Sequence, residues 1–475
     1  MDLAPGEATS RRITMNTMHR TIILAALTAL AGGCLPEKRI CWSPDGSRAA
    51  VATPTGLYLI DATGKALPPR LTGTPARCDW FPDGKRLAVV HTARAGKWSD
   101  AEPLFDKAGR DRIERHAKDA HERLLAYSGS LDDFKLDPHD ELSPGDEGAV
   151  LLCLRDRHAE KLKEKLGDKW SDLEKLQATV WKLSVFTVEA DAFKEQKALY
   201  RGLNEIHAPA VSPNGRNIAF LMNSSKREDN TISLFVVTAE GGEARQVAES
   251  VAVGYDWSPD SRSLVFIRGT TDAPPRDGSI DLGSLTTVVV CDEAGALLKE
   301  WAQRTDRVGV LFSPMLGARW LRDGRLIFSS VEVTLPATSR DMPQAWTMFV
   351  LDPRMPASVT RVLGRDFSEA VEPSLGLFET SPDEAQVLLP GPQGALSLYE
   401  FASGQTQSLV DVIDAKGKSL SLPCWRSAQE ACFVGRQQGK DGKPSAPEVW
   451  LWKAGKATCI SADWPKEMRE GWLDK

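Results

Sequence analysis

The sequence predicts an all-β protein assembled from seven copies of one small unit. Two observations lead to this prediction. A five-residue segment, Trp-Ser-Pro-Asp-Gly at residues 42–46, recurs six more times in progressively altered form along the 475 residues. Each copy is followed by short apolar segments that are rich in β-forming residues and too short for a helix. A structural unit repeated at intervals of tens of residues indicates a repeat architecture.

The repeated segment has the composition of a tight turn between two strands. Proline fixes φ for the second position of a type I turn, and aspartate and glycine suit the positions after it. We therefore expect a hairpin corner at each copy, with the glycine at positive φ. The turn residues are Trp42, Pro44, Asp45, Gly46, Trp80, Pro82, Asp83, Gly84, Pro213, Gly215, Trp257, Pro259, Asp260, Trp320, Asp323, Gly324, Pro382, Asp383 and Trp425.

Each corner is followed by segments with the length and composition of strands. Residues 217–220 and 263–267 are expected second strands, and residues 57–61 and 288–292 are expected third strands that end in a polar turn. A weaker fourth strand follows, for example at residues 244–247. Four antiparallel strands per repeat form the blade of a β-propeller, in which each blade covers the apolar face of its neighbour.

The count of repeats predicts a seven-bladed β-propeller. Two alternatives stay open: six blades, if one weak copy is a loop, or eight, if residues 310–314 begin another blade. The expected blades cover residues 38–75, 76–203, 206–249, 251–304, 316–365, 373–412 and 419–462.

The order of these segments resembles a known family. Trp-Ser-Pro-Asp-Gly, then a strand, then a strand that closes on Asp and Gly, is similar to the TolB-type, WD-repeat-like propeller family over residues 38–462. The resemblance is strong in blades 1, 3 and 4 and weak in blade 7, where Pro, Asp and Gly are all missing after Trp425. What it implies is the fold and not the partners of that family.

The first residues predict export from the cytoplasm. Arg20 precedes an apolar run at residues 22–30, which is followed by Ala31-Gly32-Gly33-Cys34. This order matches a signal peptide, and small residues directly before a cysteine resemble the lipobox of bacterial lipoproteins, from which Ala31 departs because leucine is usual there. We therefore expect residues 1–33 to be cleaved, Cys34 to be acylated, and residues 34–475 to form a propeller held at a membrane of the cell envelope, facing the periplasm or the exterior.

The charge of the chain argues against a polyanion as partner. Residues 1–33 hold three arginines and two acidic residues, so the chain from Cys34 onwards carries 56 basic and 63 acidic residues, a net charge of −7. No basic stripe of the kind that phosphate contacts require is present, and we predict no nucleic-acid partner.

The chain contains seven cysteines after Cys34, an odd number. Cys41 and Cys424 each precede the repeat tryptophan of the first and last blades, which ring closure makes neighbours, so a disulfide between them would join the ends of the ring. The favoured interpretation is that both are small buried hydrophobic residues. A bond between Cys424 and Cys432 across the last hairpin is a further alternative.

Blade 2 contains one large insertion, at residues 92–179, between its second and third strands. Ile113, Ala117, Ala120, Leu124 and Tyr127 have the spacing of an amphipathic helix. Leu151, Leu154, His158, Leu162 and Leu166 predict a second helix, with Gly167 as its C-cap. The insertion is either ornament or a partner-binding element, and we expect it to overhang the mouth of the central channel on the face where the longest loops gather.

An acidic stretch separates the two expected helices. Its acidic residues are not in the alternating order that a calcium loop of the EF-hand type requires, so the sequence favours a solvated irregular loop over a calcium site. Pro138, Pro144 and Gly145 are expected to prevent regular structure there. The acidic residues are Asp132, Asp133, Asp137, Asp140, Glu141, Asp146 and Glu147.

The catalytic patterns we looked for are missing from the sequence. It contains neither His-Glu-x-x-His nor Gly-x-Ser-x-Gly, and only His91 and His207 belong to blades. Carboxylates beside the repeat tryptophans, at Asp79, Asp256 and Glu379, are more simply explained as solvated in the channel or paired with Arg319 than as catalytic acids. We predict no enzyme, no cofactor and no metal.

The sequence leaves two functions open. The favoured one is a lipid-anchored, non-catalytic propeller that binds a protein or an envelope polymer outside the cytoplasm. The alternative is a propeller enzyme of unrecognised type acting on polysaccharide or peptide. The sequence identifies neither the partner nor the oligomeric state.

Overall fold

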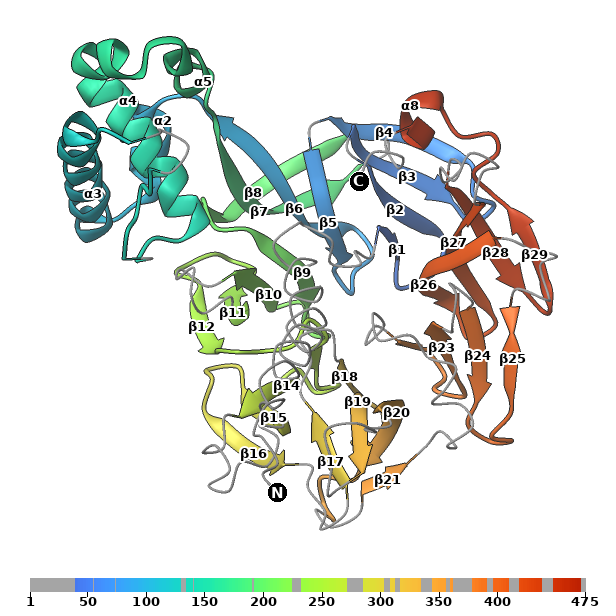
Figure 1. Ribbon diagram of the computed structural model, residues 1–475. Helices are drawn as coiled ribbons and strands as arrows, with labels where there is room; N and C mark the ends of the chain where they lie inside the picture. Colours follow the sequence, from blue (N-terminus) through green and yellow to red (C-terminus); the bar gives the residue numbers. More distant parts are fainter. Residues whose placement is uncertain are drawn as a thin grey trace, which may run out of the picture.

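Seven blades of antiparallel strands surround a common centre in the computed structural model of the chain (Figure 1). The expected signal peptide and Cys34, the expected site of acylation, lie outside the described residues. The structure describes residues 39–53, 55–72, 74–129, 134–139, 141–189, 192–223, 232–270, 285–302, 308–311, 317–334, 344–355, 359–361, 378–390, 396–409, 418–437 and 447–470.

Each blade is formed by four strands that follow one another along the chain and pair as antiparallel neighbours. The first strand of a blade lies nearest the centre, and the fourth lies at the rim (Figure 1). The predicted seven-bladed propeller is confirmed. The strands are, blade by blade, β1 (Ile40–Trp42), β2 (Arg48–Thr53), β3 (Gly56–Asp61) and β4 (Ala66–Thr72); β5 (Thr74–Trp80), β6 (Arg86–Ala95), β7 (Ala178–Val188) and β8 (Phe193–Gly202); β9 (Ile206–Val211), β10 (Asn217–Asn223), β11 (Ile232–Thr238) and β12 (Arg245–Ala248); β13 (Asp256–Trp257), β14 (Ser263–Thr270), β15 (Leu285–Asp292) and β16 (Leu297–Ala302); β18 (Ala318–Trp320), β19 (Leu326–Thr334), β20 (Gln344–Leu351) and β21 (Val359–Arg361); β22 (Glu379–Thr380), β23 (Gln386–Pro390), β24 (Leu396–Glu400) and β25 (Thr406–Ser408); β26 (Lys418–Ser427), β27 (Glu430–Gln437), β28 (Glu448–Lys453) and β29 (Lys456–Cys459).

One strand does not belong to this scheme. β17 (Val308–Leu311) follows blade 4 and pairs along its whole length with the end of β19, while Leu311 also pairs with Leu285 of β15. It therefore joins blades 4 and 5 into one continuous sheet. The alternative of an eighth blade is wrong, because Val310 and Leu311, the described residues of its expected start, extend an existing blade.

The core consists of apolar clusters between neighbouring blades. Phe81 and Leu183 of blade 2 pack with Phe220 of blade 3, and Leu321 of blade 5 packs with Phe378 and Val387 of blade 6. Comparable clusters fill the other five seams, including the seam between blades 7 and 1. Each sheet thus buries its apolar faces only by stacking on two neighbours, as expected for a repeat protein.

The ring is closed without any exchange of strands, because the first and the last blade each consist of consecutive strands. Side chains join them instead. Arg426 of blade 7 donates to the carbonyl oxygens of Gly46 and Ala62 in blade 1, both at 2.9 Å. The C-terminal segment crosses the same seam: Trp464 Nε1 donates to Gly64 O at 2.7 Å, and Met468 of α8 (Lys466–Glu470) is fully buried. In Figure 1, α8 lies beside β4.

The insertion interrupts blade 2 between β6 and β7, which pair with each other from Arg86↔Thr187 to Ala95↔Ala178. α3 follows the expected spacing from Ile113 to Leu124, although Tyr127 lies just beyond its end. α4 forms where it was expected and Gly167 caps it at positive φ, but its helical backbone is interrupted at His158, and only Leu154 and Leu162 of the expected apolar positions are buried. None of the described helices is long and apolar enough to span a membrane. The insertion contains α2 (Trp98–Ala101), η1 (Glu102–Leu104), α3 (Lys107–Ala126), α4 (Pro144–Leu166), η3 (Gly167–Lys169) and α5 (Trp170–Glu174).

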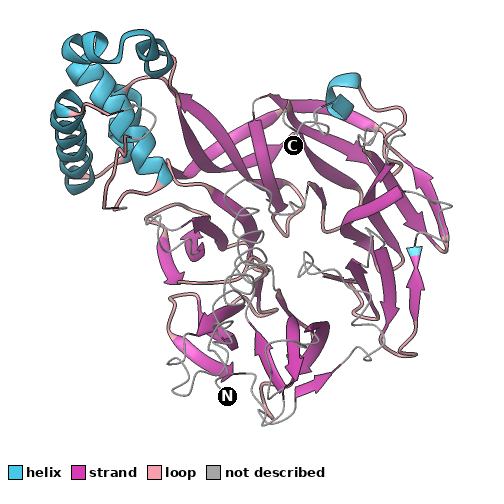
Figure 2. Ribbon diagram, in the orientation of Figure 1, coloured by secondary structure: helices cyan, strands magenta, loops and turns pink. Residues whose placement is uncertain are grey.

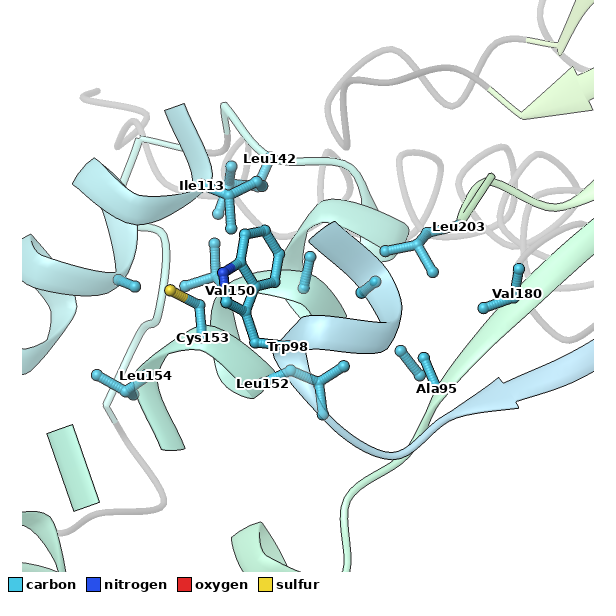
Figure 3. Packing of buried hydrophobic residues seen from close by; sticks show 14 of the residues in the cluster. Ala95, Trp98, Ile113, Leu142, Val150, Leu152, Cys153, Leu154, Val180 and Leu203 are labelled. Atoms are coloured by element: carbon cyan, nitrogen blue, oxygen red, sulfur yellow. The ribbon is translucent and has the colours of Figure 1, made fainter. Parts of the chain in front are cut away.

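The helices of the insertion share an apolar core of their own. Trp98 of α2, Ile113 of α3 and Val150 of α4 point toward one another, and Val180 of β7 and Leu203 extend this core to the blade (Figure 3). Arg155 fixes the base of the insertion by donating to Gly96 O, just after β6, and to Leu176 O, just before β7. The insertion is therefore a packed unit whose apolar core continues into blade 2.

The insertion lies outside the ring. Figures 1 and 2 show its helices beside blade 2 at the edge of the molecule and not across the centre of the ring. The expectation that it overhangs the channel mouth is therefore wrong. β6 and β7 extend toward the helices and carry them away from the centre (Figure 1).

The acidic stretch is more ordered than its composition indicates. Ser143 is the N-cap of α4 and accepts from Asp146 N at 3.0 Å, while Pro144 occupies the first turn, where its missing N–H is tolerated. Asp137 accepts from Leu142 N at 2.6 Å, and Asp137 and Asp146 are each only 5% exposed. The expectation of an irregular solvated loop is wrong for these residues. Asp132, Asp133 and Asp140 lie outside the described residues.

Candidate functional site

The corners are short turns with a common geometry. In three of them the serine hydroxyl donates to the aspartate two residues later, as Ser43 does to Asp45, Ser258 to Asp260 and Ser381 to Asp383. These bonds, together with backbone N–H donors, lower the pKa of each aspartate. The fifth residue has positive φ in six corners, at Gly46, Gly84, Gly215, Ser261, Gly324 and Glu384.

Neighbouring corners contact each other. Arg48 donates to Gly84 O at 2.7 Å, and Asn214 N donates to Ser261 Oγ at 2.9 Å. Arg322 N donates to the carboxylate of Glu384 at 2.5 Å. The side chains of the two non-glycine residues at positive φ, Ser261 and Glu384, thus accept a bond from the preceding corner. The turn motif therefore links blades to one another and leaves little room for variation.

Three of the five repeat tryptophans also link blades, whereas the Nε1 atoms of Trp42 and Trp320 are buried without a hydrogen-bond partner among the described residues. Trp80 Nε1 donates to Cys41 O at 2.8 Å, Trp257 Nε1 to Ala210 O at 3.1 Å, and Trp425 Nε1 to Glu379 O at 2.8 Å. Each bond runs from the inner strand of one blade to the inner strand of the preceding blade. The tryptophans are structural residues of the inner wall.

Two carboxylates beside these tryptophans make the opposite link, to the following blade. Asp79 Oδ2 accepts from Val211 N at 2.8 Å, and Asp256 Oδ2 accepts from Trp320 N at 3.0 Å. Asp79 Oδ1 additionally accepts from the thiol of Cys41 at 3.5 Å. Two of the three candidate channel acids, Asp79 and Asp256, are thus hydrogen-bonded to backbone groups of the next blade and are only partly exposed.

Asp256 has an unusual proton affinity. Burial raises its pKa to about 6, and the nearby Arg319 guanidinium opposes part of this shift. Arg319 Nη1 donates to Tyr255 O at 2.8 Å. The expected pairing of the channel carboxylates with Arg319 is therefore electrostatic at Asp256, since the guanidinium donates to a backbone carbonyl.

A second polar group lies at the start of the inner strand of blade 3, and the sequence did not indicate it. His207 is 2% exposed, and its Nε2 lies 3.1 Å from Asn223 Oδ1 while Nδ1 lies 3.8 Å from Glu205 Oε1. Arg77 of blade 2 is 5% exposed and donates to Ile206 O at 2.7 Å. Burial, followed by the charge of Arg77, holds the pKa of His207 well below its usual range.

Backbone strain accompanies this group. Ala208 has φ of +44°, and it precedes Pro209, a context that restricts its backbone further. The hydroxyl of the fully buried Tyr255 in blade 4 donates to Ala208 O. The Ala-Pro pair inside an inner strand was the one sequence signal of a bulge here, and β9 shifts register against β10 at this point.

The histidines of the insertion do not gather into a metal site. The rings of His121 and His158 stack with centroids 4.4 Å apart, and burial lowers the pKa of His158. His116 lies 3.7 Å from Glu141. Within the described part of the chain, no three His, Cys, Asp or Glu side chains lie together as metal ligands.

Comparisons with known proteins show likeness in fold only. No protein-family model and no curated protein matches the chain. An oligogalacturonate lyase in complex with manganese is 11% identical with a TM-score of 0.45, covering 91% of this chain and 90% of that one. The β-propeller domain of the Trilobed protease from Pyrococcus furiosus is 13% identical with a TM-score of 0.39, covering 60% of this chain and 75% of that one.

TolB from Acinetobacter baumannii is also among the similar structures. It is 14% identical with a TM-score of 0.36, and the match covers 58% of this chain and 57% of that one. The chain thus spans little more than half of TolB. At these identities and TM-scores, the likenesses give no information on activity or ligand.

Proposed function

We propose that this chain is a lipid-anchored, non-catalytic β-propeller of the TolB-like kind that binds a protein or an envelope polymer outside the cytoplasm. The observation that carries the proposal is that carboxylates of the inner wall accept hydrogen bonds from the protein backbone. Asp79 and Asp256 each accept a backbone hydrogen bond from the next blade, so both carboxylates have a structural role in linking neighbouring blades.

The anchor is supported by the sequence alone. Small residues directly before Cys34 follow an apolar run, as in bacterial lipoproteins. Metabolic labelling with a radioactive fatty acid should mark the wild-type chain and not Cys34→Ala. Equal labelling of the two, or no labelling of either, contradicts the anchor and leaves the binding proposal standing.

The helical insertion is our candidate for the binding element. It has its own apolar core and projects from the edge of the ring, where a partner can reach it without entering the channel (Figure 1). Its outer surface is highly charged: Lys107, Asp111, Lys118 and Glu122 of α3 are all exposed. A surface of this kind favours a polar partner over an apolar one.

A clean deletion can test the insertion. Ala95 and Ala178 face each other as the last cross-strand pair of β6 and β7, so replacing residues 96–177 by Asn-Gly should close an ordinary two-residue hairpin. We expect a folded ring that melts cooperatively and no longer captures the proteins or glycans that the wild-type chain retains from solubilised envelopes. Lys85→Ala, an exposed change in the corner of blade 2, is the matched control and should capture as the wild type does.

Two results would contradict this assignment. Capture that survives the deletion places the binding surface elsewhere on the ring. A deletion variant that does not fold shows that the insertion is needed for packing, and Arg115→Glu on the exposed face of α3 then tests binding without removing the core. Unchanged capture by that variant would argue against the α3 surface.

Catalysis is the second candidate, and Asp256 is the observation that favours it. A carboxyl group with a pKa of about 6 is suited to exchange protons near neutral pH, and Asp256 remains partly exposed in the inner wall. Release of unsaturated oligosaccharides or peptides by the wild type, lost in Asp256→Asn with the fold intact, would establish an enzyme of polysaccharide or peptide and overturn the non-catalytic proposal.

A further inference from the structure

Blade 7 has lost the turn that defines the other blades. Its corner at residues 425–429 has no proline, aspartate or glycine, and Ser427 Oγ merely accepts from Gln429 N at 3.3 Å. β26 and β27 shift register twice around this corner. The hairpin that completes the ring is therefore the one with the least support from its own turn.

Two cysteines face each other directly beside this corner. Cys424 of β26 and Cys432 of β27 are cross-strand partners. They are 1% and 0% exposed, and both belong to the apolar cluster between blades 7 and 1. Membership of one cluster means that both side chains leave the sheet on the same face, as a bond between them requires.

The pair occurs only in blade 7. The equivalent position before the repeat tryptophan pairs with an apolar residue in the other six blades. These pairs are Cys41↔Ala50, Asp79↔Ala88, Ala210↔Ala219, Asp256↔Val265, Arg319↔Ile327 and Glu379↔Leu388. Two thiols thus meet in the one blade whose corner is degraded.

We propose that Cys424 and Cys432 form a cross-strand disulfide that closes the first hairpin of blade 7. Directly opposite residues of antiparallel strands have Cα atoms about 4.5–5.5 Å apart, within the range of about 4.4–6.8 Å that disulfides use. The bond fixes the register between β26 and β27. In the other blades, the turn residues that blade 7 lacks fix this register. The inference rests on the proposed exported location, because disulfides persist in oxidising compartments.

The chemistry is an ordinary thiol–disulfide exchange. One thiolate attacks the disulfide of a protein oxidant or of oxidised glutathione and expels one of its sulfurs as a thiolate. The second cysteine then attacks the mixed disulfide and expels the other. The pair loses two protons and two electrons in total, and the oxidant is reduced to two thiols. Burial of both residues places this step before or during closure of the ring.

A bond between Cys41 and Cys424 is the competing pairing, and the structure disfavours it. Cys41 belongs to the cluster between blades 1 and 2, and its thiol donates to Asp79 of blade 2. Cys424 belongs to the cluster on the other face of blade 1. The two side chains therefore lie on opposite sides of that blade.

Peptide mapping of the full chain tests the proposal. The reduced, unfolded protein is refolded in a glutathione redox buffer, its remaining thiols are alkylated, and it is digested with trypsin. Arg426 lies between the two cysteines, so they fall in separate peptides, residues 419–426 and 427–436. We expect one species in which these peptides are joined, and its loss on reduction. Cys41→Ala and Cys459→Ala should keep it, and Cys424→Ala and Cys432→Ala should abolish it.

The outcomes are distinct. Recovery of both peptides separately alkylated, or of Cys424 joined to Cys41, overturns the proposal. If a cysteine variant does not fold, the map of the wild-type chain decides alone. A chain that oxidises in the buffer but is dithiol when trapped from envelopes counts against the exported location and not against the pairing, and labelling of Cys34 tests that location independently.

Discussion

The two ends of blade 2 differ in how firmly the rest of the molecule constrains them. At one end, the corner at Phe81 to Gly84 is closed by Gly84 N donating to Phe81 O, and Gly84 O accepts from Arg48 of blade 1. At the other end, β6 and β7 continue to Ala95 and Ala178 and open into the helical insertion, whose apolar core is distinct from the clusters between blades and includes Val180 and Leu203 of blade 2.

This difference indicates which end of a blade tolerates insertions. The corner of blade 2 contacts both neighbouring blades: Gly84 O accepts from Arg48 of blade 1, and a Cβ added to Gly215 of blade 3 would lie 3.4 Å from Pro82. At the opposite end of the blade, the ring requires only that the end of β6 and the start of β7 remain one strand spacing apart. Recognition can therefore be built at that end with little cost to the ring.

The largest expected effect separates the core of the ring from the core of the insertion. Phe220, fully buried between blades 2 and 3, should cost about 3–5 kcal/mol of global stability when changed to Ala. Ile113, fully buried in the insertion, should cost about 2–5 kcal/mol when changed to Ala, but locally. Hydrogen exchange with mass spectrometry should show faster exchange across the ring in the first variant and only in α3 and α4 in the second.

Faster exchange outside the insertion in Ile113→Ala would contradict the independence of the two cores. Faster exchange throughout the blades of Ile113→Ala would mean that the insertion and the ring unfold as one unit. Thermal melting gives an independent reading, since two separate transitions are expected only when the two cores are independent.

Acidification should destabilise the ring at the start of β9. The folded-state pKa of His207 lies well below its unfolded value of about 6.5, so the unfolded chain binds a proton that the folded chain does not. Its contribution to stability is full above about pH 6.5 and falls below it, by at most about 1.4 kcal/mol per pH unit. The melting temperature should therefore fall from pH 7 toward pH 5, and His207→Gln should flatten the slope.

Asp256 changes the stability with pH in the opposite direction, so its contribution must be separated from that of His207. Its folded-state pKa of about 6 lies above the unfolded value, so the folded chain binds the extra proton and gains stability as the pH falls through 6. Measuring His207→Gln in an Asp256→Asn background removes this compensation. A slope that is the same with and without His207 would contradict the assignment.

The sequence predicted the features that are repeated locally. The corner motif supplied the strand order and the number of blades, and the spacing from Ile113 to Leu124 supplied α3. These features arise from residues close together in the chain, where turn geometry and helix period act directly. The start of α4 was not predicted, because Pro144 and Gly145 were expected to prevent regular structure, although serine followed by proline, as at Ser143 and Pro144, is a helix start signal.

The inner wall could not be predicted in the same way. Asp79 accepts from Val211, which is 132 residues away, and the partner of Asp256 is 64 residues away. Such links depend on which strand each blade places innermost and on the register of its neighbour. The strain at Ala208 likewise depends on Tyr255 of another blade.

A smaller effect compares two corners. Gly46 and Gly84 have nearly the same φ, +65° and +63°, so alanine should cost about 1 kcal/mol at either from backbone strain. At Gly46 a Cβ would also lie 3.1 Å from Arg426 O across the closing seam, whereas at Gly84 the nearest atom is 3.9 Å away. Chemical denaturation should therefore find Gly46→Ala clearly less stable than Gly84→Ala. Equal losses would show that the closing seam yields easily.

The smallest effect concerns a turn on the corner face that is not yet optimal. β28 and β29 are joined by Ala454 and Gly455, both at positive φ (+46° and +79°), as in a two-residue type I′ hairpin. Asparagine tolerates this conformation better than alanine does, and Asn-Gly is the preferred pair for this turn. Ala454→Asn should raise the free energy of unfolding by roughly 0.5–1 kcal/mol. Denaturant titration measures the gain, and Ala454→Val, which should be less stable than the wild type, is the matched control.

If asparagine gives no gain while valine gives a loss, the turn is already relaxed. If neither substitution changes the free energy of unfolding, unfolding of the ring does not involve the hairpin of β28 and β29. Only the inner corners then limit which residues the turns on this face accept.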